Sequence, residues 1–356
     1  MHFDDGQIPE EYTRYIGRKI AVILAGVAVL LVLLVVSVSL GSMSIPLLDV
    51  VRTLAGRSVS ERLDIIILNI RLPQALTAVA AGAGLAVSGA VMQSVLRNPL
   101  GSPFTLGLSH AAAFGAALAV MILGAGTMTS SNVGAVHISS PYTTTGIAFF
   151  FCLVNAGVII AVSRLRRSTA EVMVLTGVAL GALFTAGTMF LQYFADDMQL
   201  AAMVFWTFGD TARASWSELG TIAGVTLLLS LFFQYNSWNY NAIDAGDETA
   251  RGLGVRVDRV RLLGMLATSL LTAVIVAFLG IIGFVGLVCP HMVRRVIGGD
   301  MRFLVPASLV TGAVLLLASD TVARLLLAPH VLPVSVLTAF LGAPVFVALI
   351  VRGGRR

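Results

Sequence analysis

Charged residues are scarce in this sequence: Asp, Glu, Lys and Arg make up 12% of its 356 residues, whereas apolar residues make up 57%. A soluble domain carries about a quarter charged residues. Polar stretches are also short, and the longest one, residues 236–261, is far smaller than a domain. These shortages exclude a disordered chain, a collagen-like chain and a soluble enzyme held by a single membrane anchor. The apolar runs that fill the rest predict one all-α domain that crosses a membrane many times.

Lysine and cysteine are nearly absent. Lys19 is the single lysine beside 22 arginines, and these cations lie mostly in short loops between apolar runs. This placement is typical of topology signals in a membrane protein and does not favour a surface that binds nucleic acid. The two cysteines, Cys152 and Cys289, both lie inside apolar runs. We therefore expect small embedded side chains and no disulfide.

Sequence motifs for catalysis are missing as well. There is no Walker phosphate-binding loop, no Gly-x-Ser-x-Gly nucleophile motif and no histidine pair with metal-ligand spacing. His291 follows Cys289 and Pro290, but positions two apart lie on different helix faces, which disfavours a metal site. We expect Pro290 to break a helix and His291 to pack at the break. The chain is thus expected to have no catalytic residue, no metal site and no bound cofactor, so that any ATP chemistry comes from another chain.

Ten segments are apolar enough to be assigned to the membrane. The first, 20–40, has 21 residues without a charge, which suffices for a crossing and is too long for the core of a cleavable signal. The others are 72–96, a segment ending near 123, 143–163, 172–194, 218–235, 262–282, the short 283–295, 303–326 and 333–351. They define one transmembrane domain over 20–351 with tails at 1–19 and 352–356. A short interfacial helix is predicted within 45–54, because Pro46 suits a first helical turn.

The basic residues favour one orientation of these ten segments. With both termini in the cytoplasm, seventeen of the 23 basic residues lie on the cytoplasmic side, as the positive-inside rule requires. Segment 283–295 has to count as a crossing, because otherwise the C-terminal arginines would lie outside. The sequence therefore predicts a multi-pass protein of the plasma (inner) membrane, with segment 236–261 in the cytoplasm.

Ionisable side chains are rare in the middle of the predicted spans. Asp320 and Arg324, four residues apart near an outer end, predict a local ion pair, with contact between Arg324 and an outer partner as the alternative. A carrier driven by protons or sodium usually needs a carboxylate inside the membrane. The shortage favours transport energised from outside the bilayer, and an ion-coupled secondary carrier stays as the alternative. An intramembrane enzyme using His291 or Asp320 would need a converging polar cluster that the sequence does not offer.

The longest polar segment contains a stretch, 246–254, that is compatible with a short helix. Residues 247–251 are polar helix formers, and Gly252 and Gly254 follow at positions suited to a helix C-cap. Such a surface helix can be a handle on which another protein docks, or only a solvated connector. Spacing alone leaves both interpretations open.

A series of short motifs, spread in order over residues 20–351, resembles the FecCD-type permease family, the membrane subunits of type II ABC importers for iron–siderophores, vitamin B12 and haem. The motifs are Arg71-Leu-Pro, Ser88-Gly-Ala-Val-Met-Gln93, Arg97-Asn-Pro-Leu100, Leu175-Thr-Gly-Val-Ala-Leu-Gly181, and the stretches 246–255, 283–291, 332–338 and 342–346. The resemblance implies about ten transmembrane helices and a dimer, formed by two copies or by two similar subunits. It also implies two ATPase subunits that bind ATP and Mg, and one substrate-binding protein on the outer side.

The resemblance also implies roles for individual residues. Contact with the ATPase is implied for Asp247, Glu248, Thr249, Ala250, Arg251, Gly252, Leu253 and Gly254. Docking of the binding protein is implied for Arg71 and Arg324, although Gln74 replaces a further arginine that the family often has. An inner gate is implied for Asn98, Leu100, Ser168 and Thr169, and a pathway lining for Thr176, Leu180 and Phe184.

The cargo cannot be read from these residues, because the family delegates recognition to the binding protein. A ferric siderophore is the first expectation. A corrinoid such as vitamin B12 is the second and haem the third, and an oxyanion such as molybdate is a further alternative.

Overall fold

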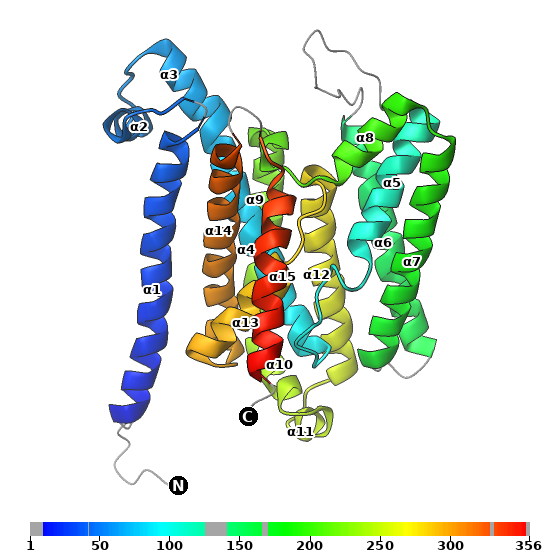
Figure 1. The fold of residues 1–356 in the computed structure, drawn as a ribbon. Coiled ribbons are helices and arrows are strands. Elements are labelled where there is room, and N and C mark those ends of the chain that lie inside the picture. Colours follow the sequence, from blue (N-terminus) through cyan, green and yellow to red (C-terminus); the bar gives the residue numbers. More distant parts are fainter. Residues whose placement is uncertain (1–9, 42, 125–140, 166–169, 328–330, 354–356) are drawn as a thin grey trace.

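The computed structural model describes residues 10–41, 43–124, 141–165, 170–327 and 331–353. They form a bundle of helices that run mostly along one axis (Figure 1) and contain no strand. The elements are α1 Glu10–Ser39, α2 Leu47–Leu54, α3 Glu61–Ile65, η1 Ile66–Arg71, α4 Leu72–Val95, α5 Leu108–Leu123, α6 Pro141–Leu165, α7 Ala170–Phe194, α8 Asp197–Thr207, η2 Thr211–Arg213, α9 Trp216–Tyr235, α10 Ser237–Asp244, α11 Asp247–Gly252, α12 Val257–Leu279, α13 Val285–Ile297, α14 Met301–Leu326 and α15 Val334–Gly353.

Seven helices of the described residues are long and apolar enough to cross a membrane: α1, the continuous run from α3 to α4, α6, α7, α9, α12 and α14. Helices α5 and α15 are apolar but shorter. With the half-length α13 they correspond to the ten predicted segments, so the all-α polytopic fold is confirmed. The interfacial helix predicted within 45–54 is α2.

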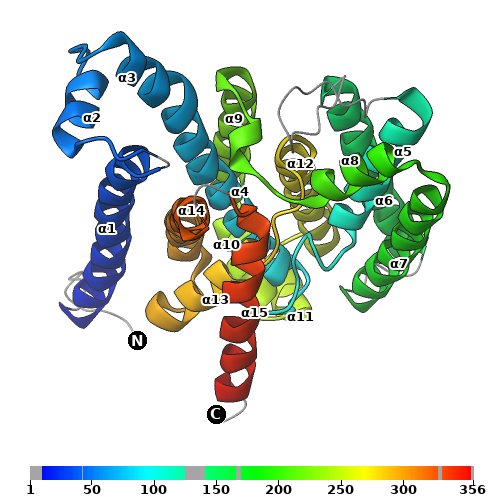
Figure 2. The same ribbon diagram turned by 45° about the horizontal axis from the view of Figure 1, so that its top comes forward.

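Helix α4 runs through the middle of the bundle and packs against α14, α12, α13 and α9. Helix α1 lies at one edge against α14, and α5, α6, α7 and α8 form a group at the opposite edge (Figure 2). The start of α1 and the end of α15 lie at the same end of the bundle as α10 and α11, whereas α2, α3 and α8 lie at the other end (Figure 1). We call these the inner and the outer end, following the predicted orientation.

Close packing of α4 depends on its glycines. A Cβ atom at Gly82 would lie 2.3 Å from the carbonyl oxygen of Gly312 in α14, and one at Gly89 would lie 1.6 Å from the carbonyl oxygen of Gly286 in α13. Real Cβ atoms do not come so close. Small residues, in which this segment is rich, let the backbones touch where lipid supplies no hydrophobic drive.

The central helix begins earlier than the sequence indicated. Instead of starting at 72, it runs without a break from Glu61 through a π-helical stretch, Ile66–Arg71, into α4. Ser60 caps its first turn by accepting a hydrogen bond from the Leu63 amide at 3.3 Å. Arg71 therefore lies inside a packed helix and not at an exposed helix start.

The prediction that Pro290 breaks a helix is wrong. Helix α13 continues through Pro290 to Ile297, and the break lies earlier, in the non-helical residues between Leu279 and Val285. These residues lead down from the outer end of α12, and α13 then continues towards the inner end of the bundle (Figure 1). At about 1.5 Å per residue α13 spans only about 20 Å, so the extended residues supply the rest of the crossing. Non-helical backbone is tolerated at this depth because surrounding protein covers it: Gly280 and Ile282 are buried.

Candidate functional site

The predicted coupling segment folds into two short helices at the inner end, α10 and α11. Gly246, with a φ of 124°, makes the turn between them, and Gly254, with a φ of 82°, follows the end of α11. The amide of Gly254 donates to the carbonyl oxygen of Arg251 at 3.0 Å. Gly254 thus closes the helix as predicted, whereas Gly252 is its last helical residue and not a cap.

Helix α11 has one buried and one exposed side. Ala250 is fully buried and packs with Ile243 and Val257, which fixes α11 on α10 and α12. The other side of the segment is open, and Leu253 is 70% exposed. The remaining exposed members of the predicted coupling set are Glu248, Thr249, Arg251, Gly252 and Gly254. This side offers another protein a polar surface with one apolar residue at its end.

Asp247, the first residue of α11, does not belong to that exposed side. Its carboxylate accepts two hydrogen bonds from Arg261 of α12, both at 3.0 Å, and lies 4.0 Å from the guanidinium of Arg97. Arg261 is 4% exposed and also donates from Nε to the carbonyl oxygen of Val95 at 2.8 Å. Both hydrogen bonds come from Nη2 of Arg261, and hydrogen bonds between charged partners are stronger than neutral ones. Asp247 therefore fastens α11 to the ends of both α4 and α12.

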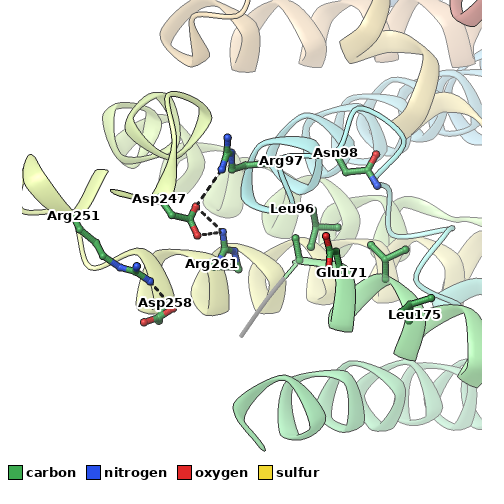
Figure 3. Close-up of a pocket in the computed structure, with 11 residues that line it drawn as sticks. Leu96, Arg97, Asn98, Glu171, Leu175, Asp247, Arg251, Asp258 and Arg261 are labelled. Carbon is green, nitrogen blue, oxygen red and sulfur yellow. Dashed lines mark hydrogen bonds and ion pairs between the residues drawn. The ribbon is translucent and has the colours of Figure 1, made fainter. Parts of the chain in front are cut away.

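A groove of about 790 Å³ opens beside this ion-pair network (Figure 3). Residues of α11 and α12 line it together with Arg97, Asn98 and the start of α7. Its lining residues are Leu96, Arg97, Asn98, Ala170, Glu171, Val174, Leu175, Asp247, Arg251, Asp258 and Arg261. The groove brings the predicted gate residue Asn98 together with the predicted coupling residues.

The predicted gate loop is compact where it is described. Asn98 accepts a hydrogen bond from the Leu100 amide at 2.9 Å, and Leu100 is 44% exposed. Ser168 and Thr169, the other two predicted gate residues, lie outside the described residues. The neighbouring Glu171 also lines the groove.

A second ionic cluster lies near the loop, and no sequence motif predicts it. Asp244 of α10 lies 3.7 Å from Arg294 of α13 and accepts a hydrogen bond from Ser94 at 3.0 Å. Burial raises the pKa of Asp244, and this outweighs the opposing effect of Arg294. A groove of about 500 Å³ lies beside this cluster and also borders Arg97 and Asn98. In the sequence Arg294 counts only among the cytoplasmic basic residues, because nothing local pairs it with a residue fifty positions earlier.

The predicted pathway residues of α7 are half-buried. Thr176, Leu180 and Phe184 share one stripe, and the ring of Phe184 packs at 5.6 Å from that of Phe114 and 6.1 Å from that of Phe151. The neighbouring stripe of α7 is more exposed. It consists of Leu175, Val178, Ala179, Ala182, Leu183, Ala186, Met189 and Phe190. The exposed stripe of α7 is therefore more open to a partner, a lipid or a cargo than the stripe that was predicted to line the pathway.

At the outer end, Arg71 is directed into the protein. It is 6% exposed and donates to the carbonyl oxygens of Val38 at 2.9 Å and Ser39 at 2.8 Å, and to that of Met43. These carbonyls belong to the end of α1 and the loop after it, which lack intrahelical partners. Arg71 therefore acts as a C-terminal cap for α1 in this structure.

Arg324 makes a second anchor next to it. Its Nε donates to Asp320 at 3.0 Å, which confirms the predicted ion pair, and its Nη2 donates to the hydroxyl of Ser37 at 2.8 Å. Gln74 also donates to Asp320, at 3.1 Å. At the position where the family often has an arginine, this chain thus has Gln74, whose side-chain amide donates a hydrogen bond to the buried carboxylate of Asp320. Neither Arg71 nor Arg324 presents a free guanidinium to the outer surface, so docking through them stays a prediction.

Comparison with known proteins agrees with this architecture. The chain is 50% identical to a Methanocaldococcus jannaschii protein described as an ABC transporter permease, over 98% of this chain and 99% of that protein. It is 38% identical to the hemin transport system permease protein of Yersinia pestis, over 90% and 94%. A solved structure described as an inward-facing metal-chelate type ABC transporter is 30% identical, with a TM-score of 0.80 over 93% of this chain and 99% of that one. Residues 29–352 match the FecCD transport family. The chain therefore belongs to the FecCD transport family and is a membrane-embedded permease subunit of an ABC transporter, without an enzymatic activity of its own.

Proposed function

We propose that this chain imports a metal chelate across the plasma membrane as one of two permease copies in a complex with two ATPase subunits. A ferric siderophore is the proposed cargo, with a corrinoid and haem as the alternatives. Both termini and α10–α11 face the cytoplasm in this proposal, and a substrate-binding protein delivers the cargo to the outer end. ATP and Mg are bound by the ATPase subunits.

The observation that carries the proposal is the groove at the inner end. Asp247 and Arg251, for which the family resemblance implies ATPase contact, line it together with Asn98 of the loop that follows α4. Because these residues line one groove, a movement of α11 can displace the gate loop without any covalent chemistry in the membrane. ATP binding would then shift the population between outward- and inward-open states of one bistable interface.

The proposed cargo rests on family and chemistry. Relatives are described as permeases for hemin, ferric citrate and vitamin B12, and one is described as a molybdate permease. A chelate hides the charge of its metal within an organic shell. A pathway lined by apolar and small side chains, such as the exposed stripe of α7, suits such a shell. It offers few fixed charges that would hold a phosphate-like anion.

The test is reconstitution. The permease would be purified from its native membranes with the subunits that remain bound, and placed in proteoliposomes with the binding protein. Uptake of an iron–siderophore, cobalamin and haem would be followed with ATP, with a non-hydrolysable analogue, and with a proton or sodium gradient. ATP-dependent uptake of one chelate supports the proposal, and the absorption bands of the loaded binding protein identify the chelate. Uptake by the chain alone along an ion gradient would instead establish a secondary carrier.

A further inference from the structure

Arg97 has a backbone conformation that its residue type does not favour. Its φ is 46°, and Phe284 is the only other non-glycine residue with a positive φ in the described ranges. Arg97 follows the last turn of α4 in a Schellman motif: its amide donates to the Ser94 carbonyl at 2.9 Å, and the next amide donates to the Gln93 carbonyl at 3.0 Å. This position is usually a glycine, because a Cβ atom is disfavoured in the left-handed region.

The side chain of Arg97 gives a reason why glycine is not used. Its guanidinium lies 4.0 Å from the carboxylate of Asp247, and it is 47% exposed. That carboxylate is already held by the buried Arg261, whose Nε is bonded to Val95 in the last turn of α4. The network therefore connects α11 to the last turn of α4 and to the gate loop that begins at Arg97 (Figure 3).

A residue keeps an unfavourable backbone conformation only where the surrounding structure imposes it, and such residues cluster at functional sites. A glycine at position 97 would cap α4 equally well or better, but it would remove one of the two arginine links between α11 and α4. The remaining Arg261 link ends on the helix itself, whereas Arg97 is the first residue of the loop that carries Asn98 and Leu100.

We propose that Arg97 is a positioning residue that transmits the displacement of α11, through Asp247, to the loop 97–100. This inference rests on the proposed function, since it concerns how ATP hydrolysis is linked to opening of the inner gate. In this proposal Asp247 connects α11 to α4 and α12 within the permease, and the exposed side of α11 makes the contact with the ATPase.

The experiment compares variants of the complete permease–ATPase complex in proteoliposomes. The number of cargo molecules imported per ATP hydrolysed is measured together with the melting temperature. Arg97→Gly should keep or raise the melting temperature and retain ATP hydrolysis, while import per ATP falls about fivefold or more, the range of typical coupling effects. Arg97→Gln, which keeps side-chain length without charge, should show the same loss. Arg97→Lys, which keeps the charge, should restore part of the coupling.

Two further comparisons isolate the ion pair. Asp247→Asn weakens the links to both Arg97 and Arg261, so it should lower import per ATP at least as much as Arg97→Gly. Adding Arg97→Gly to Asp247→Asn should cause no further loss, because the Arg97 link is already broken. Arg52→Gln is the control, since it removes an exposed ion pair of 3.6 Å with Asp49 at the outer end. It should leave import per ATP unchanged.

Unchanged import per ATP in Arg97→Gly or Arg97→Gln would overturn the inference, as would additive losses in the double variant. A melting temperature that falls in parallel with coupling in every variant would mean that the network is only structural, which also overturns it. A wild-type complex without ATP-driven import would refute the proposed function itself, and with it the inference.

Discussion

The contact between Gly89 and Gly286 provides a stringent test of the packing in the centre of the bundle. A Cβ atom added at Gly89 would lie 1.6 Å from the Gly286 carbonyl oxygen and 2.4 Å from its carbon. Contacts under 3.0 Å are essentially never observed, so Gly89→Ala requires α4 and α13 to separate by more than an ångström. The obstacle is backbone, which cannot rotate away as a side chain can.

The expected cost follows from this geometry. Overpacking by a methyl group costs about 1–3 kcal/mol where side chains can adjust, and we expect the upper part of this range here. Alanine gains about 0.5–1 kcal/mol over glycine within a helix, which only partly offsets the cost. Gly89→Ala should therefore lower the free energy of unfolding by about 2 kcal/mol, and the variant should melt at a lower temperature than wild type.

Gly157→Ala is the matched control, because Gly157 is also inside a helix but has no atom within 4 Å of an added Cβ. This variant should melt at the wild-type temperature or above it. The assay is thermal unfolding of the detergent-solubilised protein, followed by tryptophan fluorescence and by the amount of monodisperse protein left after heating. Equal melting temperatures for the two variants would refute the close approach of α4 and α13.

Three further predictions concern the polar groups. Arg324→Gln should lower stability by about 3–5 kcal/mol, since it leaves the carboxylate of Asp320 buried without its cation; a melting temperature near that of wild type would contradict the ion pair. Arg71→Gln should loosen the end of α1, which loses its side-chain cap, and hydrogen exchange at residues 37–41 should rise while exchange in α12 stays unchanged. Hydrogen bonds from Arg302 and Asn241 outweigh desolvation and lower the pKa of Asp300 to about 2. Asp300 therefore stabilises the fold above the usual pKa of a carboxyl, and this stability is lost as the pH falls towards 2. Asp300→Asn should melt below wild type at pH 7, and the difference should shrink from about pH 4 downwards; a pH-independent difference would refute the shifted pKa.

The spans could be predicted from sequence because an apolar run long enough to cross a bilayer is a local property. The density of small residues in 72–96 is likewise a local property, and it favours close helix packing where lipid supplies no hydrophobic drive. The sequence could not locate the break near α13, because proline is tolerated within a helix when its neighbours do not need the missing hydrogen bond. The chain is non-helical at residues 280–284, where surrounding protein covers the backbone, and only the packed structure shows this.

The polar sites divide in the same way. The short helix at 247–251 and the pair Asp320–Arg324 could be predicted, because their partners lie within one or two helical turns. The cap that Arg71 forms on α1 could not, nor could the bond between Gln74 and Asp320, which are 246 residues apart in the chain. These contacts exist only because α1, α4 and α14 pack side by side.

By itself the sequence determined that this chain is a polytopic membrane protein, how its segments divide, and, through its ordered motifs, the family to which it belongs. These features depend on hydrophobic length, charge distribution and short-range spacing, which a linear chain displays directly. Only the tertiary structure decided which way each side chain is directed. It turned Arg71 and Arg324 inward onto α1, and it brought Asp247, Arg97 and Arg261 together at the end of α4. The physical reason is that hydrogen bonds and ion pairs act over a few ångströms, so their partners are fixed by helix packing and not by distance along the chain.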